Sequence, residues 1–171
     1  MYNKVLPSNE FSEKLAKVVL DFRNDFKTIK GNLVPKDVGI DTYESTVTLP
    51  GSIDNYITVS HSVKDPAPSF QSVMYSGEDY DKAVKVYKNV FKLIKRTRVK
   101  WVDKYLANFM GTMEPPEGLN FTVSYLKVDI SDVRYKYFIT EVELTNTNFA
   151  NWEVRVNISK KKLDTEILPD N

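Results

Sequence analysis

The chain has 171 residues, of which 42% are hydrophobic and 27% are charged, and its formal net charge is +1. These values are typical of a folded globular domain and exclude an intrinsically disordered chain. The absence of cysteine excludes disulfides, thiolate metal sites and cysteine nucleophiles, and no apolar run reaches the roughly 18 residues that a membrane span requires.

The first predicted element is an amphipathic helix from about residue 8 to residue 30. Its apolar residues recur every three or four positions, as on one face of a helix: Leu15, Val18, Val19, Phe22, Phe26 and Ile29. Gly31 follows where a glycine in the left-handed conformation commonly ends a helix. The pattern therefore predicts a long first helix that ends at this glycine.

A strand is predicted at residues 56–63, because apolar and polar side chains alternate there. His61 shares the side of Ile57 and Val59, so we expect it to point toward the core as a hydrogen-bonded residue. A second strand is predicted at residues 70–76.

A second amphipathic helix is predicted from about Ser76 or Gly77, either of which could cap it, to about residue 96. Its apolar stripe consists of Tyr80, Ala83, Val84, Tyr87, Phe91 and Ile94. Three strands are then predicted at residues 121–128, 136–144 and 152–159. Residues 99–113 are ambiguous, because Trp101, Tyr105 and Phe109 have helical spacing while the segment from Phe109 onward also suits a strand.

The two predicted helices align at a shift of 65 residues, and Thr-Val-Ser recurs in the strands that follow them. This predicts a single domain over residues 1–171 with internal repeats at 8–76 and 77–160. The expected fold class is α+β, with two main helices packed on one face of an antiparallel sheet in two layers.

No motif of a known catalytic or nucleotide-binding class occurs, and the single histidine rules out a histidine pair. The sequence therefore predicts no catalytic residue, no metal site and no cofactor. Glu141 and Glu143 lie on one side of a predicted strand, where we expect solvated carboxylates rather than a catalytic pair.

One basic helix face is the strongest surface feature, with nine basic and two acidic residues between Asp81 and Lys104. Six cations lie opposite the apolar stripe of the second helix: Lys82, Lys85, Lys88, Lys92, Lys95 and Arg96. Such a face is most often simply solvated, and its functional interpretation is an acidic partner: an acidic protein surface, anionic lipid headgroups or a nucleic-acid backbone. Nucleic acid is the less favoured partner, because lysine dominates and the rest of the chain is acidic.

The polar side of the sheet is the second candidate surface. Tyr56, Thr58, Ser60, Ser62, Thr122, Ser124 and Arg155 are expected to share it. It could hold a partner protein or a small ligand.

The leading hypothesis is a non-enzymatic binding or accessory protein that uses one or both surfaces. The tyrosine-rich composition and polar strands favour a periplasmic or extracellular protein whose signal peptide is absent from this chain. One alternative is a small enzyme or ligand carrier with a pocket between sheet and helices that contains His61 and Tyr125. The other is nucleic-acid binding through the basic helix. The sequence does not indicate an oligomeric state.

Overall fold

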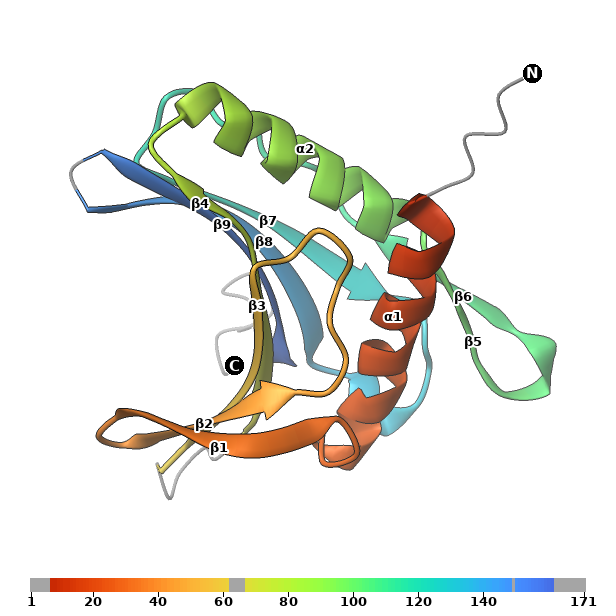
Figure 1. The fold of residues 1–171 in the computed structure, drawn as a ribbon. Coiled ribbons are helices and arrows are strands. Elements are labelled where there is room, and N and C mark those ends of the chain that lie inside the picture. Colours follow the sequence, from red (N-terminus) through yellow and green to blue (C-terminus); the bar gives the residue numbers. More distant parts are fainter. Residues whose placement is uncertain (1–6, 62–66, 149, 162–171) are drawn as a thin grey trace, which may run out of the picture.

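Two α-helices cover one face of a nine-stranded sheet in the part of the chain that the computed structural model describes, residues 7–61, 67–148 and 150–161 (Figure 1). All neighbouring strands are antiparallel. The predicted α+β class is confirmed. Within the described residues, no helix has the length and apolar character needed to traverse a bilayer.

Each half of the chain contributes one helix and one half of the sheet. The first half supplies α1 (Pro7–Asp21), the 3-10 turn η1 (Phe22–Asn24), β1 (Lys30–Asp37), β2 (Ile40–Ser45), β3 (Asp54–Ser60) and β4 (Ser69–Gly77). The second supplies α2 (Tyr80–Arg96), β5 (Arg98–Lys100), the 3-10 turn η2 (Val102–Lys104), β6 (Leu106–Met110), β7 (Phe121–Val128), the 3-10 turn η3 (Val133–Tyr135), β8 (Phe138–Asn148) and β9 (Asn151–Lys160).

The strand order is β1-β2-β3-β4-β9-β8-β7-β6-β5, so the two halves meet where β4 pairs with β9. This order is compatible with an internal duplication, which stays a prediction. Strands β1 and β2 were not expected, because both sequences are polar and that of β1 contains Pro35. Pro35 is tolerated because β1 is an edge strand of the sheet.

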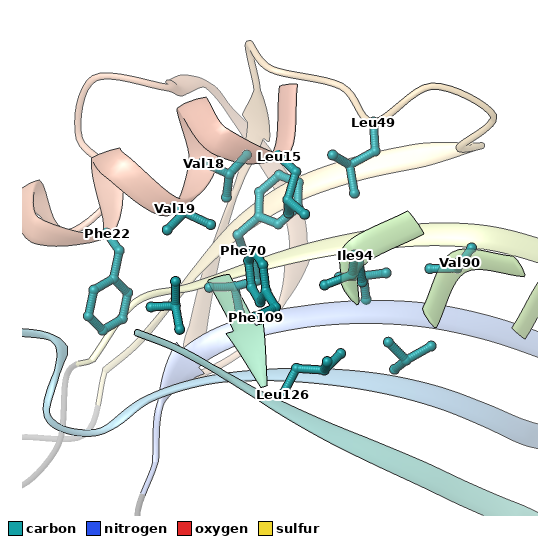
Figure 2. Close-up of a cluster of buried hydrophobic side chains, with 14 of the residues drawn as sticks. Leu15, Val18, Val19, Phe22, Leu49, Phe70, Val90, Ile94, Phe109 and Leu126 are labelled. Atoms are coloured by element: carbon teal, nitrogen blue, oxygen red, sulfur yellow. The ribbon is translucent and has the colours of Figure 1, made fainter. Parts of the chain in front are cut away.

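The core lies between the helices and the sheet, and Figure 2 shows side chains from both layers meeting there. Leu15 of α1, Ile94 of α2, Phe70 of β4 and Leu126 of β7 are all fully buried. Leu49, from the loop between β2 and β3, closes one side. Its backbone N–H donates to the side-chain oxygen of Asn55 at 3.2 Å, which fixes this loop over the core.

The first helix ends nine residues earlier than its apolar pattern predicted. Its last residue, Asp21, is buried, and one carboxylate oxygen accepts the backbone N–H groups of Thr28 at 3.0 Å and Ile29 at 3.1 Å. Asp25 and Phe26 adopt left-handed φ values of 55° and 57°. The chain therefore winds around the Asp21 carboxylate instead of continuing the helix.

Gly31 is not the residue that ends this helix. It lies in β1, and a Cβ atom there would approach the backbone oxygen of Glu44 in β2 to 2.9 Å. The glycine is required by the close approach of two strands.

The second helix begins later than predicted, since Asp79 rather than Ser76 or Gly77 caps it. The Asp79 carboxylate accepts the backbone N–H of Lys82 at 3.1 Å. The ambiguous segment 99–113 does not form an α-helix. It forms the β5–β6 hairpin with η2 at its turn, which resolves the ambiguity in favour of strands.

Candidate functional site

His61 does not point into the core, contrary to the sequence prediction. Its side chain is 53% exposed, and its Nε2 atom lies 2.9 Å from a carboxylate oxygen of Asp41. Strand β3 ends at Ser60, one residue before the histidine. The alternating pattern that placed His61 on the apolar side therefore extends past the part of the strand that the helices cover. The histidine lies outside the core for this reason.

Tyr125 does not meet His61 in a common pocket. Tyr125 is on β7, which is separated from β3 by β4, β9 and β8. The space between sheet and helices is occupied by the hydrophobic core. The predicted pocket with these two residues as its polar members is absent from the described part of the chain.

Thr122 and Ser124 were expected on the polar face, and this was wrong. Both are buried on the side of the helices, where the hydroxyl groups of Ser124 and Tyr87 are hydrogen-bonded to each other. Apolar residues occur on both sides of their strand, so the sequence does not indicate which side faces the helices. Leu126, which shares a side with Thr122 and Ser124, is buried in the core and thereby determines the orientation. Tyr125 consequently lies on the opposite face. Ser62 lies outside the described residues.

A groove on the face of the sheet away from the helices brings three of the predicted residues together. Tyr56 and Thr58 of β3 and Arg155 of β9 line a hollow of about 230 Å³. Its other lining residues are Ile40, Thr42, Gln71 and Val73. The pairing of β2, β3, β4 and β9 places these side chains on one face.

The groove presents hydroxyl, carboxamide and guanidinium groups. The Thr58 hydroxyl lies 2.6 Å from that of Ser69, and the Arg155 guanidinium donates to the Glu153 carboxylate. The sequence did not indicate four other residues as part of this groove: Ile40, Thr42, Gln71 and Val73. The pairing of β2 with β3 would have placed Thr42 and Ile40 here, but the polar sequence of β2 does not predict a strand.

The same face of the sheet carries an unexpected carboxylate pair. Glu141 and Glu143 are alternate residues of strand β8, next to the central strand β9, and Glu141 is only 7% exposed. Burial and the adjacent Glu141 carboxylate raise the pKa of Glu143 to about 7. Lys161 donates to Glu141 at 3.0 Å. The expectation of two freely solvated carboxylates is therefore wrong.

These two carboxylates do not form a recognisable metal site. Within the described ranges, no three side chains of histidine, aspartate or glutamate are grouped as metal ligands. Their position beside Arg155 and Asn157 instead creates a polar, partly desolvated centre whose charge depends on pH.

The basic face of α2 is exposed along its whole length. All six predicted cations, from Lys82 to Arg96, are exposed, while Ala83, Tyr87 and Ile94 on the other side of the helix are buried. The Lys95 ammonium donates to the backbone oxygen of Gly111. No carboxylate of the described residues forms an ion pair with any of the other five.

We call these six residues the lysine row. The five lysines are three or four positions apart, as in Lys85 to Lys88 and Lys88 to Lys92, and Arg96 lies four positions after Lys92. Such neighbours face each other on a helix, and each like-charged pair destabilises it by roughly 0.2–0.5 kcal/mol. The row therefore has unfavourable internal electrostatics.

Comparisons with known proteins identify no relative: no protein-family model, no curated protein and no solved structure matches this chain.

Proposed function

We propose that this protein is a non-enzymatic binding or accessory protein that binds an acidic protein partner along the lysine row. The observation that carries the proposal is the row itself, with exposed cations at three- and four-residue spacing and no counter-ion among the described residues for five of the six. An acidic surface would relieve their mutual repulsion, and the association would weaken as salt screens the charges.

Nucleic acid is the less favoured partner. Proteins that bind single strands interleave exposed aromatic residues with their cations, and base-specific readers rely on arginine. On α2 the aromatic residues Tyr87 and Phe91 are buried, and the row contains a single arginine. A periplasmic or secreted location remains a prediction.

The test measures fluorescence anisotropy of labelled poly-L-glutamate and of a labelled DNA duplex at 50 mM and 200 mM salt. A variant with Lys85→Gln, Lys88→Gln and Lys92→Gln should lose at least tenfold in affinity for poly-L-glutamate. A control variant with Lys17→Gln, Lys27→Gln and Lys104→Gln removes the same charge from other exposed positions and should lose much less.

Equal losses in the two variants would mean that only net charge matters and would overturn the proposal. Tighter binding of DNA than of poly-L-glutamate at both salt concentrations would replace the acidic protein with nucleic acid as the partner.

The groove on the sheet favours a second function, the binding of a small polar ligand. Tyr56, Thr58 and Arg155 offer donors and acceptors to one molecule in a hollow of about 230 Å³. An NMR screen of small polar compounds should give chemical-shift changes at β3, β4 and β9 that Arg155→Ala removes. Changes that survive this substitution would place the ligand elsewhere.

A further inference from the structure

A separate hollow lies where the first helix ends, away from both surfaces described above. It has a volume of about 220 Å³, and its lining includes Phe22, Arg23, Asp25, Pro68, Arg134 and Lys160. These residues come from η1 and the turn after it, from the residue preceding β4, from η3 and from the end of β9. Three cationic side chains thus converge from three distant parts of the chain.

Two of the cations are held in place by neighbours. The Arg134 guanidinium makes two hydrogen bonds to the Asp132 carboxylate, at 2.9 and 2.7 Å. Arg23 lies over the ring of Trp101, with 5.2 Å between its guanidinium carbon and the ring centroid. A guanidinium has five N–H donors, so these contacts leave donors available on both arginines. Donors fixed in advance lose little conformational entropy when they bind a ligand.

The charges around the hollow select the charge of its ligand. Arg23, Arg134 and Lys160 carry three positive charges, and Asp25 and Asp132 carry two negative ones, which leaves a net charge of +1. The hydrogen bonds from Arg134 lower the pKa of Asp132 to about 2, so this carboxylate is ionised at neutral pH. A monoanion balances this arrangement, whereas a dianion would overcompensate it.

The remaining lining is apolar. Phe22, Phe26 and Pro68 line the hollow beside the cations, and its accessible apolar surface comes from Pro68 and the small exposed part of Phe22. A ligand with one carboxylate and a small apolar body matches both parts of the hollow, because carboxylates accept paired hydrogen bonds from guanidinium groups.

We propose that this hollow binds a small monocarboxylate, with the carboxylate on Arg134 and Lys160 and the apolar body against Phe22 and Pro68. This site is independent of the lysine row and of the groove on the sheet.

Benzoate is the probe, and its binding is followed by NMR chemical-shift titration at pH 7.5. We expect saturable changes at residues 22–26, 134 and 160. Arg134→Gln should weaken binding at least tenfold, while Lys136→Gln, which removes an exposed cation that does not line the hollow, should leave it unchanged. Asp25→Asn removes the opposing charge and should tighten binding about threefold. Asparagine tolerates the left-handed conformation of this position, so the turn should persist.

Two further ligands test the chemistry. Benzamide has the shape of benzoate without its charge and should not bind. Inorganic phosphate should bind more weakly than benzoate. Equal binding of benzamide, equal or tighter binding of phosphate, or the absence of any saturable change with benzoate would each overturn the proposal.

Discussion

The two helices have almost the same apolar pattern, yet they end in different ways. Phe26 and Ile29 correspond to Phe91 and Ile94 at a shift of 65 residues, and all four side chains are buried. Phe91 and Ile94 lie within α2, whereas Phe26 and Ile29 follow the end of α1 in an irregular turn. Apolar periodicity therefore indicates which side chains become buried, but it does not establish that the backbone stays helical to the last of them.

The cause of this difference is a single carboxylate. Asp21 accepts two backbone N–H groups from the turn and the side-chain amide of Asn24. The corresponding residue in α2 is Val86, which has no acceptor, so nothing competes with the helical hydrogen bonds there. The different ends of the two helices thus coincide with an aspartate in one segment where the other has valine.

The helices also differ in charge. On α1, Glu10 precedes Lys14 and Glu13 precedes Lys17 by four residues, an arrangement of opposite charges that favours a helix. On α2, the positions of the lysine row carry only positive charge. The charge pattern of α1 is largely compensated within the helix, while that of α2 calls for a counter-charge from outside.

The largest expected effect comes from replacing the two matched phenylalanines by glycine. Phe91→Gly should reduce the free energy of unfolding by about 5 kcal/mol, because it removes a buried ring and places glycine inside a helix. Phe26→Gly should cost only about 3 kcal/mol. Glycine adopts the left-handed backbone conformation of this position without strain, which offsets part of the loss of the buried ring. Urea denaturation measures both values.

The alanine variants at the same positions are the control for this pair. Phe26→Ala and Phe91→Ala should each cost about 3–5 kcal/mol, because each removes a buried ring and alanine, unlike glycine, does not relieve the left-handed conformation at position 26. Equal costs for the two glycine variants would show that the turn after α1 carries no backbone strain.

Removal of the Asp21 carboxylate should have the next largest effect. Asp21→Ala leaves the N–H groups of Thr28 and Ile29 without their acceptor and should cost about 2–3 kcal/mol. Val86→Ala at the matched position of α2 should cost about 1 kcal/mol. Hydrogen exchange of the Thr28 and Ile29 amides should accelerate only in the Asp21 variant. Unchanged exchange there would mean that other contacts hold the turn.

The stability of the protein should depend on pH through Glu143, which lies in the second half of the sheet. Its pKa of about 7 in the folded protein is raised from 4.5, so the folded state binds this proton more tightly than the unfolded chain does. The contribution of the protonated Glu143 to the free energy of unfolding is complete below about pH 4.5 and is lost as the pH rises through 7. Between pH 5 and pH 8, the wild type should lose about 2 kcal/mol relative to Glu143→Gln. Parallel pH profiles of the two proteins would contradict this assignment.

The sequence was sufficient to predict the fold class, the alternation of β9 and the exposure of the lysine row, since each of these follows from local periodicity. Val154, Val156 and Ile158 are buried in the core and alternate with Arg155, which lies on the polar side as expected. The turn around Asp21 could not be predicted, because a buried aspartate and an exposed one look alike in a sequence.

The candidate sites show the same division. Tyr56, Thr58 and Arg155 were expected on one face, and they do line one groove. His61 was misplaced because its position depends on where helical cover stops, and the raised pKa of Glu143 depends on burial around β8. The hollow at Arg23, Arg134 and Lys160 was not anticipated. Its residues are up to 137 positions apart in the chain and are joined only by the tertiary fold.

The smallest expected effect tests the contrast in charge between the helices. Lys88→Glu turns the two like-charged pairs that Lys88 forms with Lys85 and Lys92 into two pairs of opposite charge. It should raise the melting temperature by about 1–2 °C in low salt. Lys17→Glu on α1 opposes Glu13 and should lower it by a similar amount. Both shifts should shrink in 1 M NaCl, where exposed charges are screened. If Lys88→Glu instead left the stability unchanged at low salt, the lysine row would not be under electrostatic repulsion, and its lack of counter-ions would no longer point to an acidic partner.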